Sequence, residues 1–182
     1  MEMAPHAIGE LLSTALANCK RVARVRPIHG EVKREDLQVL ADLPWARSVL
    51  VQLIVNAHLY SWPDQPITIS SERKGGFALR SVADQGPGIE KAEAARIFER
   101  FCRFKGQKIR ANGTGMGLPI AQAMVEAHGG AIDVVSRFGY GSVCTFSLRL
   151  DPCCEAGSDV RKGPALLFCA QGLLTVSLRA TV

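Results

Sequence analysis

Hydrophobic residues recur at intervals of three and four along several segments of the chain. This spacing places apolar side chains on one face of a helix. Asp42 and Pro44 stand where the start of a helix is expected, and Gly129 and Gly130 stand where one is expected to end. The helices predicted in this way cover residues 7–20, 44–61, 90–99 and 116–128.

Other segments are rich in alternating apolar and polar residues, which is typical of strands in a half-buried sheet. Lys74-Gly75-Gly76 separates two of these segments and is a hairpin signal. The segments cover residues 28–41 (two short strands), 67–72, 77–83, 131–136 and 142–148. Because helices and strands are interspersed along the chain, we predict an α/β fold. It is a two-layer sandwich in which helices cover one face of a mixed, mostly antiparallel sheet.

The length of 182 residues corresponds to one domain with room for a short appendage. Hydrophobic residues make up 47% of the chain and charged residues 21%, which excludes disorder of the whole chain. No apolar run reaches the roughly 18–20 residues that span a bilayer. The N-terminus lacks the pattern of a signal peptide. We therefore expect a cytoplasmic protein without a membrane span.

The cysteines of the chain show neither C-x-x-C spacing nor the Cys and His spacing of zinc sites. We interpret them as reduced thiols, several of which fill the core. They are Cys19, Cys102, Cys144, Cys153, Cys154 and Cys169.

Two groups of polar residues are candidates for ligand binding. Gln52, Asn56 and Tyr60 are spaced four residues apart, so they form a polar stripe along the predicted helix. An asparagine oxygen on such a stripe can bind Mg²⁺, although the stripe can also be the polar side of an amphipathic helix. Asp84 follows a strand and precedes Gly86 and Gly88. This aspartate can accept a hydrogen bond from an exocyclic amine, and the glycines let backbone approach a flat ligand; the alternative is an ordinary turn.

Residues 97–118 add two further signals. Between residues 100 and 112 there are five basic residues and no acidic one, a charge suited to polyphosphate, unless these side chains are simply solvated. Residues 113–118 then bring glycines to the start of a helix, where backbone N–H groups attract anions. This loop matches neither the Walker motif nor the dinucleotide fingerprint.

Together and in this order, the four motifs resemble the ATP-binding catalytic domain of sensor histidine kinases. This domain is a branch of the Bergerat-fold superfamily, which also includes gyrase, MutL-type repair proteins and a chaperone family. The resemblance covers residues 37–150, and it implies ATP and Mg²⁺ as cofactors. It also implies transfer of the γ-phosphoryl group to a histidine on another domain or chain.

Carried over residue by residue, the resemblance implies that Asp84 binds the adenine amino group and that Asn56 binds Mg²⁺ between the phosphates. Tyr60 packs near the nucleotide, and Arg103 reaches the phosphates, so that Asn56 and Arg103 are the implied catalytic residues. Further residues shape the adenine pocket or wrap the triphosphate. They are Gly86, Gly88, Ile89, Gly113, Thr114, Gly115, Met116, Gly117 and Leu118.

Two positions depart from the family pattern. Gln52 cannot act as a base, which disfavours the ATPases and serine kinases that need a glutamate there. Leu59 replaces a lysine that contacts phosphate in the family. A catalytically impaired nucleotide-binding regulator is therefore the alternative to a kinase, and an ATPase is a weaker one.

None of the four histidines matches a phosphoacceptor motif, and we interpret them as structural: His6, His29, His58 and His128. The resemblance accordingly implies a histidine-containing dimerisation domain and a response regulator as partners, and no nucleic acid. We expect residues 1–36 to be a helix and first strand leading from a missing dimerisation or sensor region. Residues 37–151 are then the ATP-binding domain, and residues 152–182 are an appendage of unknown role.

Overall fold

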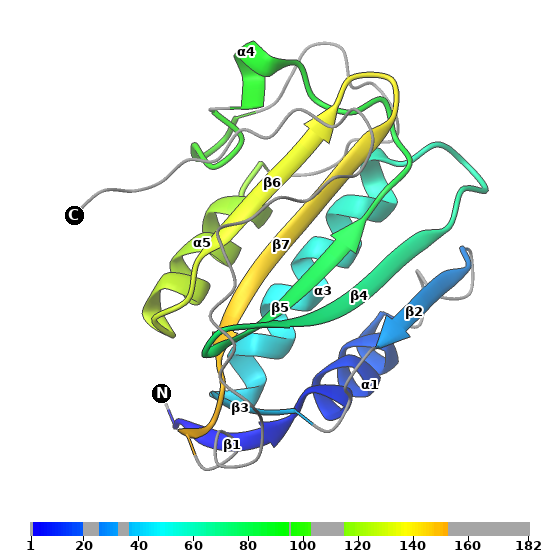
Figure 1. Cartoon of the computed structure of the whole chain (residues 1–182). Coiled ribbons are helices and arrows are strands. Elements are labelled where there is room, and N and C mark those ends of the chain that lie inside the picture. Colours follow the sequence, from blue (N-terminus) through cyan, green and yellow to red (C-terminus); the bar gives the residue numbers. More distant parts are fainter. Residues whose placement is uncertain (1, 20–25, 33–36, 95, 103–114, 153–182) are drawn as a thin grey trace.

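The computed structural model describes residues 2–19, 26–32, 37–94, 96–102 and 115–152. Its elements are β1 (Ala4–Ala7), α1 (Ile8–Asn18), β2 (Ile28–Val32), β3 (Gln38–Ala41), α3 (Leu43–Tyr60), β4 (Ile67–Lys74), β5 (Phe77–Ala83), α4 (Lys91–Ala94), α5 (Gly117–Ala127), β6 (Ile132–Arg137) and β7 (Gly141–Arg149). A five-stranded sheet in the order β2-β4-β5-β7-β6 forms one layer, and α1, α3 and α5 lie behind it in the other (Figure 1). β2 is parallel to β4, and the other neighbours in this sheet are antiparallel. The predicted two-layer sandwich is confirmed.

Helix α3 runs beneath the centre of the sheet and begins and ends where its sequence predicts. The side chain of Asp42 caps it by accepting a hydrogen bond from the backbone N–H of Trp45 at 3.3 Å. Its apolar stripe is buried against the sheet and the neighbouring helices, and consists of Ala46, Val49, Leu50, Leu53, Ile54 and Ala57. Burial of this stripe fixes which polar side chains of α3 remain free to face a ligand.

The N-terminal segment joins this core through a strand that the sequence pattern does not predict. β1 pairs antiparallel with β3, so that Ala4 lies opposite Ala41. α1 follows directly, and its buried residues belong to the same hydrophobic cluster as those of α3 and the sheet. The Arg80 side chain of β5, which is fully buried, donates from Nη2 to the carbonyl oxygen of Ile8 at 3.0 Å.

The predicted hairpin between β4 and β5 forms, a second hairpin joins β6 and β7, and the two turns lie at opposite ends of the sheet (Figure 1). β4 and β5 are joined at Gly75 (φ 55°), and β6 and β7 at Gly139 (φ 84°). Of the helix predicted over residues 90–99, the described residues are helical at Lys91–Ala94. Beyond it, Glu99 donates its backbone N–H to the carbonyl of Arg96, which is the spacing of a turn rather than of an α-helix.

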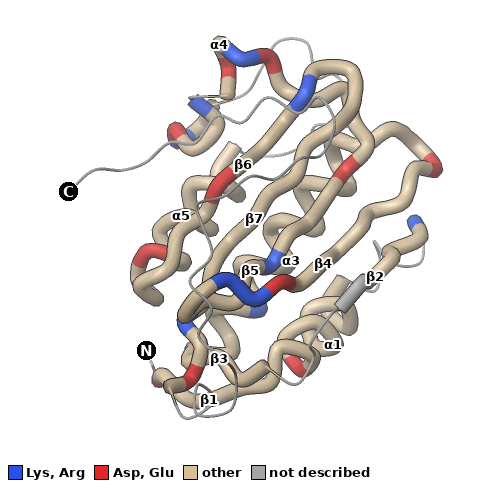
Figure 2. Tube along the Cα trace, viewed as in Figure 1, with Lys and Arg blue, Asp and Glu red and all other residues tan. Residues whose placement is uncertain are grey.

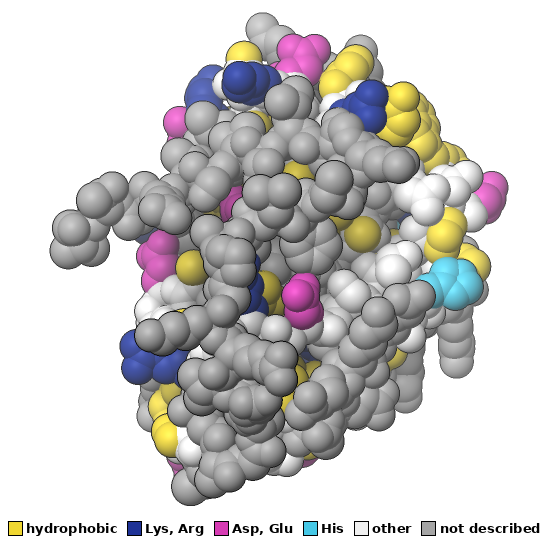
Figure 3. Space-filling view, in the orientation of Figure 1, with side chains coloured by type: hydrophobic (Ala, Val, Ile, Leu, Met, Phe, Trp, Pro, Cys, Tyr) yellow, Lys and Arg dark blue, Asp and Glu magenta, His cyan; other side chains and the backbone are white. Residues whose placement is uncertain are grey.

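Charged residues lie mainly in loops and near the ends of elements (Figure 2). Within the described part of the chain, no helix has the length and apolar character needed to cross a membrane. The tip of the β6–β7 hairpin exposes Phe138 and Tyr140, and the Arg137 guanidinium stacks on the Tyr140 ring at 3.9 Å. In Figure 3, hydrophobic and basic side chains gather at this end of the molecule.

Candidate functional site

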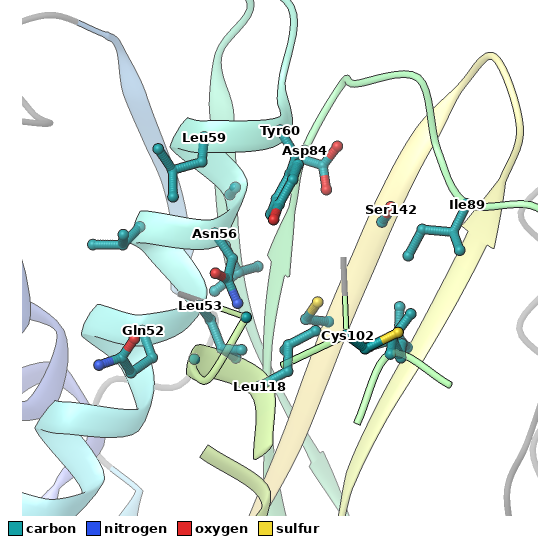
Figure 4. Close-up of a pocket in the computed structure, with 18 of the residues that line it drawn as sticks. Gln52, Leu53, Asn56, Leu59, Tyr60, Asp84, Ile89, Cys102, Leu118 and Ser142 are labelled. Atoms are coloured by element: carbon teal, nitrogen blue, oxygen red, sulfur yellow. The ribbon is translucent and has the colours of Figure 1, made fainter. Parts of the chain in front are cut away.

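A cavity of about 200 Å³ lies between α3, the ends of β5 and β7, and the start of α5. Figure 4 shows how the side chains labelled there surround it. Most of the predicted site residues in the described chain line it: Asn56, Tyr60, Asp84, Gly88, Ile89, Gly115, Gly117 and Leu118. Gly86 and Met116 stand beside these residues in the chain but are not among those that line the cavity. Arg103, Gly113 and Thr114 lie outside the described residues.

The polar stripe of α3 meets the start of α5. A Cβ atom added at Gly117 would lie 3.2 Å from Oδ1 of Asn56 and 3.1 Å from Oε1 of Gln52. A glycine is therefore needed for the first turn of α5 to approach these amides without displacing them. The arrangement places amide oxygens, which are suitable ligands for Mg²⁺, beside the positive end of a helix dipole.

Asp84 follows the last residue of β5 and lines the cavity. Its Oδ1 atom accepts a hydrogen bond from the backbone N–H of Gly86 at 2.9 Å. Burial raises the pKa of Asp84 to about 6, although hydrogen bonds from Gly86 and Ser142 and the charge of Arg26 favour the ionised form. The cavity thus holds a partly desolvated acceptor, which a ligand that donates a hydrogen bond can satisfy.

The loop after Asp84 is held by contacts that only glycine permits. A Cβ atom at Gly86 would overlap the Tyr60 carbonyl oxygen. At Gly88, which has φ 69°, one would overlap the carbonyl oxygen of Arg137. The backbone N–H of Ile89 donates to Ser136 Oγ at 2.9 Å, which ties the loop to β6. The loop is therefore positioned by α3 on one side and by the β6–β7 hairpin on the other.

Two residues of β7, Ser142 and Cys144, also line the cavity, and the sequence motifs do not identify them. Their hydroxyl and thiol lie on the same face of β7 as the buried Phe146, as the two-residue period of a strand requires. Ser142 Oγ is 3.0 Å from Ser136 Oγ, so the serines link both strands of the hairpin beneath the site. The alternation of side chains along the strand predicted at residues 142–148 is the sequence signal that places Ser142 and Cys144 on one face.

Among the described residues that line the cavity there is no lysine or arginine. Leu59, which stands at the position of the family's lysine, is one of the lining residues and adds an apolar surface there. The basic residues of segment 103–112 lie outside the described residues.

Comparison with known proteins assigns this fold and site to a class. A family model described as histidine kinase-, DNA gyrase B-, and HSP90-like ATPase matches residues 41–152. The chain belongs to this family, whose ligand is ATP. The similar solved structures are histidine kinases, and the part that matches this chain has the same Bergerat fold.

Individual proteins that are similar to this chain in sequence or structure are histidine kinases. The sensor-like histidine kinase SenX3 of Mycolicibacterium smegmatis is 36% identical over 126 residues, which are 69% of this chain and 33% of SenX3. The catalytic domain of the histidine kinase ThkA is 29% identical with a TM-score of 0.71, over 82% of this chain and 96% of that structure. Full-length ShkA in complex with AMPPNP is 27% identical with a TM-score of 0.70, over 82% of this chain and 31% of ShkA. The chain therefore spans about a third of the length of SenX3.

Proposed function

We propose that the chain is the cytoplasmic, Mg·ATP-binding catalytic part of a sensor histidine kinase. It transfers the γ-phosphoryl group of ATP to a histidine that a dimerisation domain supplies, and a response regulator receives it next. The observation that carries this proposal is the placement of Asp84 and Asn56 around one cavity that the start of α5 closes. The ShkA complex supports it, because ShkA is bound to the nucleotide analogue AMPPNP and its fold is similar to that of this chain.

In this proposal each motif has a separate role. Asp84 accepts a hydrogen bond from the adenine amino group, and Tyr60 and Ile89 flank the base. Asn56 Oδ1 holds Mg²⁺, which neutralises phosphate charge when it is bound. Backbone N–H groups and the helix dipole at the start of α5 attract the phosphates, and they belong to Gly115, Met116, Gly117 and Leu118. The family resemblance assigns further phosphate contacts to Arg103, Gly113 and Thr114. Catalysis then consists mainly of positioning and charge neutralisation, for which Gln52 need not act as a base.

The hydrogen bonds of His128 support a structural role for this residue and a phosphoacceptor histidine elsewhere. Its Nδ1 atom lies 2.8 Å from the Met124 carbonyl oxygen, so Nδ1 donates. Its Nε2 atom accepts from the backbone N–H of Asp42 at 3.2 Å, so both ring nitrogens are engaged in structural hydrogen bonds. In this proposal the phosphoacceptor histidine lies on another domain or chain, residues 1–36 are the junction to a dimerisation or sensor region, residues 37–151 are the ATP-binding domain, and residues 152–182 are an appendage.

Calorimetric titration with Mg·ATP tests nucleotide binding. Saturable binding is expected, and Asp84→Asn should weaken it roughly 10- to 100-fold, because a charged acceptor is lost. Asp133→Asn is the matched control, since Asp133 is also a partly buried aspartate whose pKa burial raises, but it is not among the residues that line the cavity. No binding at millimolar nucleotide, or equal loss in both variants, would contradict the proposal.

Phosphotransfer is tested separately with γ-labelled ATP and a histidine-bearing dimerisation domain. Label on the histidine of that domain supports a kinase. Nucleotide binding without any transfer would instead identify the chain as a regulatory module, to which the departures at Gln52 and Leu59 would then contribute.

A further inference from the structure

Ser136 on β6 lies behind the wall of the cavity, and none of the roles proposed above uses it. It is on the same face of β6 as Val134, which lines the cavity, but Ser136 itself is not among the lining residues. In the pairing of β6 with β7 it stands opposite Ser142, which does line the cavity. A substitution at Ser136 therefore acts on the cavity through its neighbours and not by direct contact with a ligand.

The hydroxyl group of Ser136 connects three segments of the chain. Its oxygen accepts a hydrogen bond from the backbone N–H of Ile89 at 2.9 Å. The Gly141 carbonyl oxygen and Ser142 Oγ are the two acceptors within reach of its proton, each at 3.0 Å. The loop after Asp84, strand β6 and the start of β7 thus converge on one side chain.

Ser142 continues this connection to Asp84. Its side chain hydrogen-bonds to the Asp84 carboxylate, and its carbonyl oxygen accepts from the backbone N–H of Asp84 at 2.8 Å. When Ser142 gives its hydroxyl proton to the carboxylate, its oxygen is still able to accept the proton of Ser136. The donors then run in one direction, from the Ile89 N–H through the two serines to the carboxylate. Figure 4 shows Ser142 between Asp84 and Ile89. Hydrogen bonds in such a chain polarise and strengthen one another.

We propose that Ser136 is a positioning residue for base recognition, which orients Ser142 so that the Asp84 carboxylate is held as an acceptor for the exocyclic amino group of adenine. The inference rests on the proposed nucleotide binding. Hydrogen bonds from the Gly86 backbone and the Ser142 side chain satisfy part of the carboxylate and fix its orientation. Lone pairs remain for an N–H group of the ligand.

The loop after Asp84 has further attachments that do not involve Ser136. The backbone N–H of Gly139 donates to the Pro87 carbonyl oxygen at 2.6 Å, and Gly88 packs against the Arg137 carbonyl oxygen. Loss of the Ser136 hydroxyl therefore loosens the carboxylate without detaching the loop. We expect Ser136→Ala to fold, and its effect to be specific for the ligand group that Asp84 binds.

The test measures the affinity of the full chain for Mg·ATP and for the magnesium complex of purine riboside triphosphate, which lacks the 6-amino group. The wild-type protein should prefer ATP about tenfold or more, because only ATP donates a hydrogen bond from that position. In Ser136→Ala the affinity for ATP should fall about threefold to tenfold and that for the analogue less than about twofold, so the preference shrinks. Ser136→Thr keeps the hydroxyl group and should restore the preference.

Ser147→Ala is the matched control. Ser147 Oγ also accepts a backbone N–H, that of Ala131 at 2.8 Å, and donates to the Ala131 carbonyl oxygen at 3.3 Å. It links the same two strands at their other end and is not among the residues that line the cavity, so its loss should leave both affinities unchanged.

Equal loss of affinity for both nucleotides in Ser136→Ala would show a merely structural role and overturn the inference. A preference for ATP that stays at the wild-type value in Ser136→Ala would also overturn it, as would a Ser136→Thr variant that behaves like Ser136→Ala. Failure of the wild-type protein to bind Mg·ATP would instead count against the proposed function, so the two failures are distinguishable.

Discussion

At the scale of single residues, Asp84 links ligand binding to stability. Its pKa of about 6 in the folded protein exceeds the usual value of 3.8, so folding favours the protonated carboxyl. The contribution of this carboxyl to the free energy of unfolding is complete below about pH 4. It is lost as the pH rises through 6, because the carboxyl must then ionise in a desolvated site. The residue that we propose recognises the nucleotide is therefore one that destabilises the ligand-free protein at neutral pH.

We predict that Asp84→Asn raises the free energy of unfolding at pH 7.5 by about 1–3 kcal/mol, because a neutral amide avoids this cost. At pH 4.5 the wild-type carboxyl is itself mostly protonated, so the difference should shrink towards zero. Urea unfolding of both proteins at the two pH values measures it. A difference that is the same at both pH values would show that ionisation of Asp84 does not control stability.

At the scale of elements, β5 connects the N-terminal segment to the site. Arg80 lies in the middle of β5, is fully buried, and donates to Ser71 Oγ on β4 and to the carbonyl oxygen of Ile8. A buried cation needs such acceptors, because an unsatisfied charged donor is costly. β5 ends one residue before Asp84, so the same strand carries the recognition residue and the anchor of α1.

We predict that Ser71→Ala lowers the free energy of unfolding by about 1–3 kcal/mol, because it removes an acceptor from the buried guanidinium. Ser70→Ala is the matched control: Ser70 is the neighbour of Ser71 on β4 and points to the opposite face of the sheet, so its loss should cost less than about 0.5 kcal/mol. Denaturant melts of the two variants provide the comparison. Equal effects would mean that Ser71 contributes no specific bond.

The elements also show what local sequence can and cannot predict. α3 and the hairpins at Gly75 and Gly139 were predictable, because a helical period, a cap and turn glycines are local signals. β1 was not, since it has only four residues and pairs with a strand more than thirty residues away. The motifs identified Asn56 and Asp84 by their spacing. The burial of Arg80 depends on which strands become neighbours, and no short window of sequence contains that information.

At the scale of the whole molecule, the N-terminal helix and the nucleotide cavity share one core. Leu11 of α1 is 2% exposed and belongs to the same buried cluster as Leu53 and Val82, which also line the cavity. A shared core couples the free energies of its parts, so α1 and the cavity should unfold together. Bound nucleotide should then stabilise α1, although the helix contributes no residue to the cavity lining.

We predict that Leu11→Ala lowers the free energy of unfolding by about 2–4 kcal/mol and leaves a single transition, because it creates a cavity in this core. Leu16→Ala on the same helix, where the side chain is only partly buried, should cost less. Urea melts followed both by circular dichroism and by nucleotide binding measure the coupling. If binding persisted beyond the loss of α1, the helix would be a separate unit. Coincident loss would show that α1 and the cavity belong to one cooperative unit.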